Sequence, residues 1–282
     1  MPSRTGRRRT EPDASPVYAL GSDPLERQRL QRQADELGAL SSELLDHTRL
    51  GAGDSAIDLG CGPRGVLDLL AARVGPAGRV MGLDFDAASV ALAEAFALER
   101  GLSNVQVMRG DAGNTGLPDS SFDAVHARTL LINVPDPAAV VTEMVRLTRP
   151  GGVVVAMEPD IPLTVCYPRL EEWERMAQLF GQSYARDGAD PAIGRRLDEL
   201  FRNAGLVETG TEAHMTVFPH GHSRRTVRAE LFRTLRSKLV ARGMAGATEL
   251  DELDRAVRTH LADPRTLVAY TSFSAWGRKP AA

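Results

Sequence analysis

The sequence of 282 residues has little of what would suit an oxidising, membrane or polyanionic environment. It holds two cysteines, Cys61 and Cys166, which are too few for a disulfide framework, so a cytoplasmic setting is expected. Its apolar runs stay well below the roughly 18 residues that cross a bilayer, so no membrane partner is expected. The 34 Lys and Arg nearly balance the 37 Asp and Glu, which gives no reason to expect nucleic acid as a partner.

Three segments follow from the distribution of apolar residues. Residues 1–16 combine arginines with Pro, Ser and Thr and have almost nothing to bury, so they are predicted to be a disordered tail. Residues 17–50 are predicted to be a helical segment, because leucines recur at helical spacing from Pro24 to Arg49. Residues 51–282 are long enough for one large α/β domain.

Short apolar runs alternate with helical patterns through the first part of that domain. Such alternation is typical of an α/β fold, here a Rossmann-like, mostly parallel sheet of seven strands with helices on both faces. The expected strands are 56–59, 79–83, 105–108, 122–126, 152–157, 208–218 and 266–278, the last antiparallel. Helices are expected at 66–74, 87–100 and 137–148. The pattern changes after Glu158, where helical lid insertions are predicted at about 159–190 and 223–262.

A glycine-rich turn, with Gly60, Gly62 and Gly65, follows the first strand. Glycines permit a tight turn and close approach of a ligand, and the start of the next helix offers N–H groups to an anion. The spacing also matches the dinucleotide fingerprint Gly-x-Gly-x-x-Gly, which would indicate an NAD-dependent oxidoreductase. Asp58 inside the strand and Pro63 inside the turn count against that cofactor, because proline removes an N–H that a pyrophosphate would use.

The run Ala-Ile-Asp-Leu-Gly-Cys-Gly-Pro-Arg-Gly, residues 56–65, resembles motif I of the class I S-adenosylmethionine (SAM)-dependent methyltransferases. Its third glycine is displaced by one residue, a spacing that also occurs in that family. The resemblance implies SAM as the cofactor and S-adenosylhomocysteine as its product. It also implies that Asp58, Gly60 and Gly62 belong to the cofactor site.

Two further strand ends carry the acidic residues that the resemblance requires. Asp84, followed by Phe85, lies roughly 20 residues beyond the turn, where a carboxylate accepts the ribose hydroxyls; its alternative role is a helix N-cap. Asp111 and Ala112 end the third strand, and in the family such a pair contacts the adenine. All four are therefore predicted to bind the cofactor.

The resemblance runs from about residue 17 to about 158 and is greatest to the ubiquinone and menaquinone C-methyltransferases and related small-molecule enzymes. It implies that Tyr18 and Gln33 close over the methionine end of the cofactor. Gln33 has the alternative of a solvated helix residue.

Candidates for the chemistry end the fourth and fifth strands, where ligands bind in such sheets. His126 is a candidate general base, or else a buried core histidine. Arg128 is expected to hold the carboxylate of SAM or to line the acceptor pocket. Glu158 is expected to orient the acceptor or to cap a segment. No metal is expected, because the spacing of His214, His220 and His222 does not fit a metal site.

The sequence therefore predicts a SAM-dependent methyltransferase (EC 2.1.1.-) acting on an O, N or C atom of a small organic molecule. That acceptor is expected to be a secondary metabolite or its precursor, in natural product biosynthesis. One alternative is a SAM-binding enzyme that catalyses another reaction, such as a cyclisation. The others are an NAD-dependent oxidoreductase and a SAM-sensing protein without catalysis. Because an N-terminal arm can pack on a second copy, a homo-oligomer is also among the expectations.

Overall fold

The computed structural model of the protein describes residues 24–281. The predicted tail, 1–16, and the predicted cofactor residue Tyr18 lie outside the described residues. Within the predicted helical segment, α1 (Pro24–Glu36) and α2 (Gly38–Asp46) are both helices. The described helices include none that is long and apolar enough to span a membrane.

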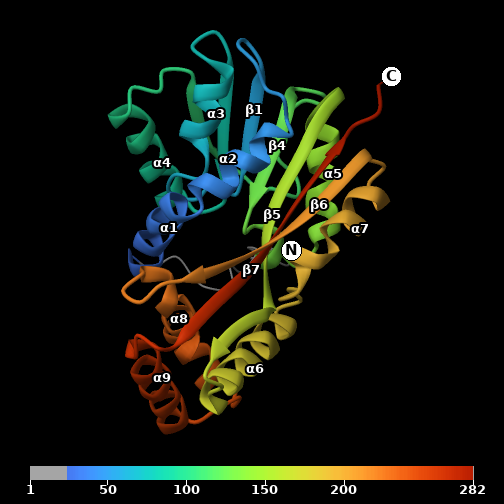
Figure 1. The fold of residues 1–282 in the computed structure, drawn as a ribbon. Coiled ribbons are helices and arrows are strands. Elements are labelled where there is room, and N and C mark those ends of the chain that lie inside the picture. Colours follow the sequence, from blue (N-terminus) through green and yellow to red (C-terminus); the bar gives the residue numbers. More distant parts are fainter. Residues whose placement is uncertain (1–23, 282) are drawn as a thin grey trace, which may run out of the picture.

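One sheet of seven strands runs through the described chain in the order β3-β2-β1-β4-β5-β7-β6 (Figure 1). Strands β1 to β5 run parallel to one another, whereas β7 is antiparallel to both β5 and β6. The Rossmann-like fold class and the antiparallel last strand are thereby confirmed. The strands are β1 (Ser55–Leu59), β2 (Arg79–Asp84), β3 (Val105–Arg109), β4 (Phe122–Arg128), β5 (Thr148–Tyr167), β6 (Val207–Phe218) and β7 (Leu267–Arg278).

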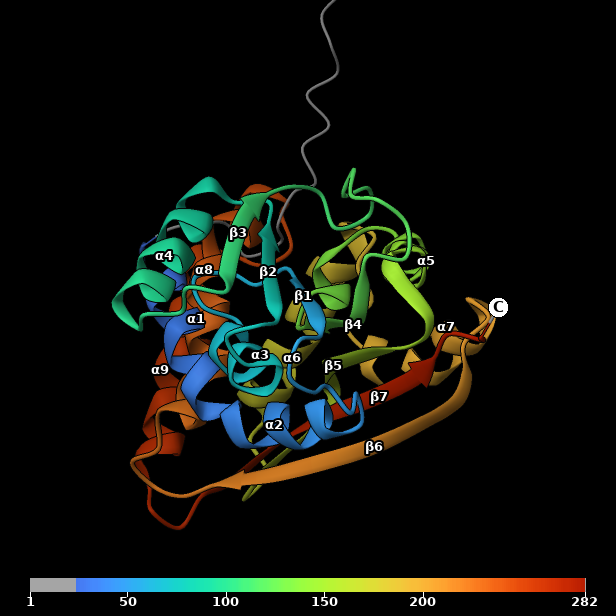
Figure 2. The same ribbon diagram turned by 90° about the horizontal axis from the view of Figure 1, so that it is seen from above.

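Helices cover both faces of this sheet, as Figure 2 shows from above. Alternate residues of a strand point to opposite faces, so β5 contributes to two cores. Val153 and Val155 pack in one core, with α2, α3 (Leu67–Val74) and α4 (Ala87–Glu99). Val154 and Ala156 pack in the other, with α5 (Pro137–Leu147) and α7 (Leu197–Asn203).

Strand β5 differs from the sequence-based expectation, because it continues to Tyr167 where a lid was predicted from residue 159. Its pairing with β7 shifts register between Asp160 and Thr164, so the intervening residues form a bulge. Two prolines, Pro159 and Pro162, interrupt the alternating pattern here, and proline is tolerated in strands at such irregular places. The interruption hid the strand from sequence reading.

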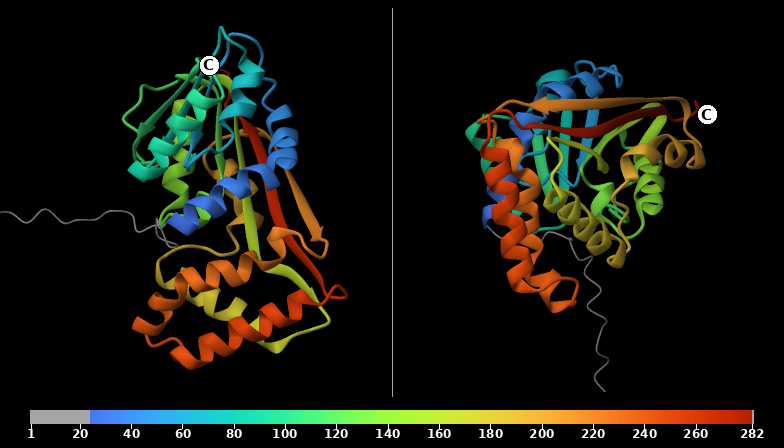
Figure 3. Two further views of the ribbon diagram at one scale, coloured as in Figure 1. Left: turned by 90° about the vertical axis from the view of Figure 1, so that its left-hand side faces the viewer. Right: turned by 60° about the horizontal axis from the view of Figure 1, so that its bottom comes forward.

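Helices gather around the carboxyl ends of β5 and β6 and the start of β7, away from α3 and α4 (Figure 3). They are α6 (Glu171–Arg186), α8 (Val227–Ala241) and α9 (Ala247–Ala262). Their shared core includes Trp173, Met176, Phe232 and Leu253. Helix α1 joins this group, because Glu36 pairs with Arg224 in the short 3₁₀ helix η3 (Ser223–Thr226). The other 3₁₀ helices are η1 (Leu131–Asn133) and η2 (Ile193–Arg196).

Candidate functional site

The turn after β1 is shaped by glycines in the left-handed backbone region. Gly60, Gly62 and Gly65 have φ values of 67°, 57° and 56°. A Cβ on Gly65 would lie 2.0 Å from Oδ2 of Asp58, and one on Gly60 would lie 2.8 Å from Cδ1 of Leu130. The turn therefore favours glycine at all three places for conformation, and at positions 60 and 65 for space as well.

The N–H groups of this turn are largely used within the protein. Two of them donate to the carbonyl of Leu83 at 2.8 and 3.0 Å, one to Asp84 at 2.7 Å and one to Asp58 at 3.0 Å. They are the N–H groups of Gly60, Cys61, Gly62 and Val66. The expectation of free N–H groups concerned the start of the next helix, where the N–H of Val66, the residue before α3, is used by Asp58. Because Pro63 has no N–H, few donors remain for a pyrophosphate, which argues against NAD.

Asp84, at the end of β2, is held by two backbone donors. Its Oδ2 accepts from the N–H of Gly62 and its Oδ1 from the N–H of Asp86, at 2.7 and 2.9 Å. The N-cap of α4 is Asp86, which accepts from the N–H of Ser89 at 3.0 Å, so Asp84 has no capping role. Burial raises the pKa of Asp84, although the two donors oppose that shift. Each oxygen keeps a lone pair for a hydroxyl donor.

A cavity, named here the sheet-edge cavity, opens beside this turn at the carboxyl ends of β1 to β4. Every predicted cofactor residue within the described part of the chain lines it. These residues are Gln33, Asp58, Gly60, Gly62, Asp84, Phe85, Asp111, Ala112 and Arg128. Their assembly at one edge follows from the parallel order of the strands, because their carboxyl ends meet there.

Phe85 and Asp111 both line the sheet-edge cavity. The ring of Phe85 is 39% exposed although it is large and apolar, and the Arg109 guanidinium lies 5.6 Å from its centroid. Asp111 accepts from the N–H of Gly113 at 2.8 Å and stays exposed. An exposed aromatic ring beside an exposed carboxylate suits a flat heterocycle with an amino group.

Arg128 lines the same cavity from the end of β4. It donates to Oγ of Ser41 at 2.8 Å and to the carbonyl of Gly65 at 3.3 Å. Burial lowers the pKa of Arg128, with the nearby Asp58 acting in the opposite direction. Because both hydrogen-bond acceptors are neutral, the guanidinium can still receive a carboxylate.

His126 is 1% exposed and lines neither of the two cavities described here. Its Nδ1 lies 2.7 Å from Oδ1 of Asp58, and its Nε2 is buried without a partner among the described residues. This position matches the alternative of a buried histidine and argues against a general base, which must reach the acceptor. The pair fixes Asp58, which in turn holds the N–H of Val66.

Glu158 is fully buried at the end of the parallel part of β5. Its carboxyl group accepts from the N–H groups of Leu130, Leu131 and Ile132 at 2.8, 2.7 and 3.2 Å. Glu158 thus caps η1, which is the second of the two roles expected from the sequence. Burial raises its pKa to about 7, against the opposing effect of the three donors.

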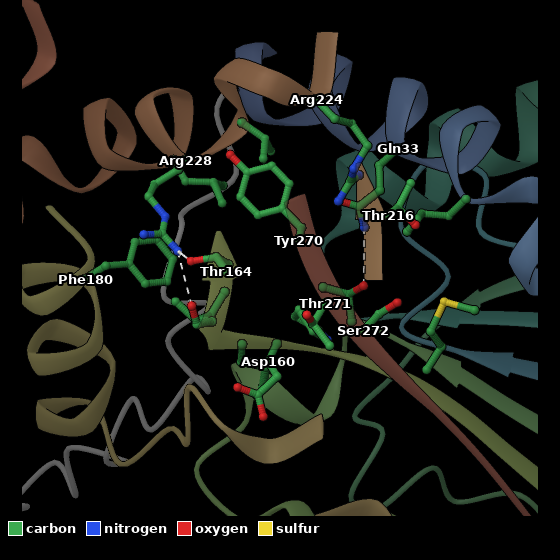
Figure 4. Close-up of a pocket in the computed structure, with 18 of the residues that line it drawn as sticks. Gln33, Asp160, Thr164, Phe180, Thr216, Arg224, Arg228, Tyr270, Thr271 and Ser272 are labelled. Carbon is green, nitrogen blue, oxygen red and sulfur yellow. Dashed lines mark hydrogen bonds between the residues drawn. The ribbon is translucent and has the colours of Figure 1, made fainter. Parts of the chain in front are cut away.

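A second cavity, named here the helix-covered cavity, lies between the extended ends of β5 and β7 and the helices α1, α6 and α8 (Figure 4). It shares Gln33, Thr129 and Asn133 with the sheet-edge cavity. Gln33 donates from Nε2 to Oγ1 of Thr129 at 3.3 Å and accepts from Arg29 at 2.6 Å. The two cavities therefore meet at a wall of three polar side chains.

Sequence reading missed Thr129 and Asn133 as wall residues. Thr129 has a φ of 56°, a strained value for a residue other than glycine, and its N–H donates to the carbonyl of Met157 at 2.8 Å. Asn133 donates to the carbonyl of Thr129 at 2.8 Å and accepts from Tyr184 at 3.3 Å. No local sequence pattern predicts these contacts, although the position of Thr129 just after β4 indicated that it lies at the ligand-binding edge of the sheet.

The three histidines considered from the sequence lie away from both cavities, whereas Cys61 lines the sheet-edge cavity. His214, His220 and His222 line neither cavity, and residues 24–281 contain no group of three metal-ligating side chains suited to a metal ion. Cys61 is buried in the turn, which raises the pKa of its thiol, so it is not an activated nucleophile.

Comparisons with known proteins agree with this geometry. Residues 50–205 match a family model described as a methyltransferase domain. Demethylmenaquinone methyltransferase of Geobacillus sp. strain WCH70 is 34% identical over 174 residues, which are 57% of this chain and 74% of that protein. Nocamycin O-methyltransferase of Saccharothrix syringae is 38% identical over 134 residues, 48% of this chain and 46% of that protein.

A solved structure shares the fold. It comes from Bacillus halodurans C-125, was described as a methyltransferase candidate, and superposes with a TM-score of 0.60 at 18% identity. The match covers 85% of this chain and 98% of that one. At this identity the likeness concerns the fold alone.

Proposed function

The chain belongs to the class I SAM-dependent methyltransferases, and from that premise we propose that it methylates a small organic molecule held in the helix-covered cavity. We propose an O, N or C atom as the target, in a secondary metabolite or its precursor. The observation that supports this proposal is the wall of Gln33, Thr129 and Asn133, which the two neighbouring cavities share. An acceptor atom beyond that wall lies next to the methionine end of the cofactor site.

The sheet-edge cavity fits SAM by its donor set and its shape. Gly60 and Gly62 line the cavity with left-handed backbone and no side chain, so a ligand can lie against the backbone there. Asp84 would accept the ribose hydroxyls, Asp111 the adenine amino group, and Arg128 would receive the carboxylate. SAM would supply an electrophilic methyl group on its sulfonium: as the acceptor atom bonds to that methyl, the sulfur–methyl bond would break, S-adenosylhomocysteine would leave, and the acceptor would release its proton to solvent.

The protein's own contribution is proposed to be positioning and exclusion of water. The acceptor must sit in line at about 3 Å from the methyl carbon, which turns a bimolecular step into an effectively unimolecular one. Apolar walls from Met157, Phe180 and Tyr184 remove water from the acceptor. His126 and Glu158 take no direct part, because neither lines the cavity; they hold the turn and η1 in place.

Binding and turnover test this proposal. Asp84→Ala should weaken SAM binding about 10- to 150-fold, since a buried hydrogen bond to a charged group contributes roughly 1.5–3 kcal/mol. Calorimetry with SAM measures this change, and Asp251→Ala on the surface of α9 serves as the control. Calorimetry with NAD should show no binding. Tight NAD binding without SAM binding would refute the proposal.

Transfer itself is followed with SAM labelled in the methyl group and a panel of small aromatic and polyketide-like molecules. Label should move to the acceptor in step with the appearance of S-adenosylhomocysteine. An acceptor that is converted without S-adenosylhomocysteine would favour the alternative of a SAM-bound cyclase-type enzyme instead.

A further inference from the structure

Charged side chains on the wall of the helix-covered cavity are paired with opposite charges, with one exception among the described residues. Arg29 pairs with Glu26 at 2.7 Å, and Arg224 pairs with Glu36 at 3.3 Å. Asp160 holds Arg195 through two contacts of 2.6 and 2.7 Å. The remaining charged wall residue is Arg228, on the first turn of α8.

Arg228 is 5% exposed and has no carboxylate within salt-bridge distance in the described part of the chain. One Nη donates to the carbonyl of Ile161 at 3.1 Å and to Oγ1 of Thr164, both on the bulge of β5. The other, Nη1, is buried and has no hydrogen-bond partner within residues 24–281. The guanidinium also lies 4.2 Å from the centroid of the Trp173 ring.

A buried cation surrounded by neutral groups raises the energy of the empty protein and makes the cavity electropositive. Burial lowers the pKa of Arg228 to about 10, so the side chain stays charged at neutral pH. Neutral acceptors and an aromatic face orient the guanidinium but do not cancel its charge. An incoming anion would cancel it.

We propose that the acceptor carries a carboxylate, or another singly ionised group, which pairs with Arg228. This inference rests on the proposed function and names the substrate class for it. Arg228 contributes a single positive charge that is not paired with an acidic side chain of the described residues, which favours a singly charged anion over a phosphate dianion. The neighbouring walls of Phe180 and Tyr270 suit a flat or apolar body attached to that group (Figure 4).

The place of Arg228 also fixes the orientation of the acceptor. Arg228 lines only the helix-covered cavity, whereas Gln33 lines both cavities, and Figure 4 shows the two side chains apart from each other, with Tyr270 between them. The anion is thus an anchor remote from the shared wall. The atom that receives the methyl group lies at the other end of the acceptor.

Binding of acids and of their neutral amides tests this assignment. The probes are benzoate, 2-naphthoate and octanoate, each paired with its amide, titrated by calorimetry into protein saturated with S-adenosylhomocysteine. At least one acid should bind tenfold or more tightly than its amide. Arg228→Met should abolish that preference, whereas Arg233→Met, an exposed arginine on the same helix, should retain it.

Each remaining outcome decides the question. If the unaltered protein binds no acid more tightly than its amide, or binds none of the probes, the assignment is overturned. It is also overturned if Arg228→Met still binds the acid more tightly than the amide. Arg228→Gln provides a second neutral variant should the methionine variant fail to fold, and S-adenosylhomocysteine affinity reports folding. Failure of the unaltered protein to bind S-adenosylhomocysteine would instead refute the proposed function itself.

Discussion

The two cavities are built in different ways. The sheet-edge cavity is made mostly by short segments that follow β1 to β4, with one wall from α1, so most of its residues come from strand ends and from turns with glycine or aspartate. The helix-covered cavity combines α1, the bulge of β5, α6, α8 and the start of β7, which lie far apart along the chain. Local backbone chemistry thus forms the first, and long-range packing forms the second.

Their electrostatics differ in the same sense. The carboxylates of the sheet-edge cavity, Asp58 and Asp84, accept backbone N–H groups from the turn that they line. In the helix-covered cavity charges pair between side chains, and Arg228 has neutral partners among the described residues. Arg128 in the sheet-edge cavity likewise donates to neutral acceptors. Each cavity therefore leaves the positive charge of one arginine for an anionic group of its ligand.

A substitution at Gly65 should disturb the sheet-edge cavity most strongly while leaving the helix-covered cavity intact. Gly65→Ala forces a Cβ to within 2.0 Å of Asp58 Oδ2 in a left-handed backbone. The conformation alone costs about 1–2 kcal/mol, and the clash adds more. We expect a loss of S-adenosylhomocysteine affinity of more than 100-fold, measured by calorimetry, together with a lower free energy of unfolding.

Gly101→Ala is the matched control for Gly65. Gly101 has a φ of 65°, but a Cβ there would meet nothing within 4 Å. It should lower stability by the conformational cost alone and leave cofactor affinity unchanged. Equal effects of the two variants on cofactor affinity would show that the contact with Asp58 has no special importance.

The same difference explains what the sequence could predict. Asp84 and Asp111 were found because Asp84 ends β2 and Asp111 follows the end of β3, in the order that the family resemblance requires; their roles at the cofactor stay predictions. The strand after Glu158 was missed because two prolines interrupt its alternation. Arg228 was missed because its helix carries several arginines, and only the tertiary fold decides which of them is buried.

Glu158 links the two cavities through η1, and its protonation should change stability with pH. Burial raises its folded-state pKa to about 7, above the value near 4.5 of an exposed glutamate. The folded protein therefore binds this proton more tightly than the unfolded chain. The stabilisation is fully present below about pH 4.5 and is lost as pH rises through 7. It amounts to at most about 3 kcal/mol.

Urea unfolding of the protein and of Glu158→Gln at pH 5 and pH 8 measures this contribution. The glutamine cannot titrate, yet its carbonyl can still accept from Leu130 and Leu131. The unaltered protein should lose more stability between the two pH values than the variant does. Equal losses would show that the carboxyl group stays ionised across this range.

The role of His126 gives a smaller and more discriminating prediction. Its pairing with Asp58 makes it a positioning residue for the cofactor turn, so the donor at Nδ1 matters and basicity does not. His126→Ala should lower stability by roughly 1.5–3 kcal/mol and weaken cofactor binding, because the buried carboxylate loses a partner. His126→Asn places an amide donor near the same position and should restore most of the stability, the cofactor affinity and the transfer activity.

A general base at His126 would behave otherwise: both variants would bind the cofactor but fail in transfer, and the rate would lose its pH dependence. Calorimetry and label transfer on the two variants therefore decide between a histidine that supports the turn and one that acts on the acceptor.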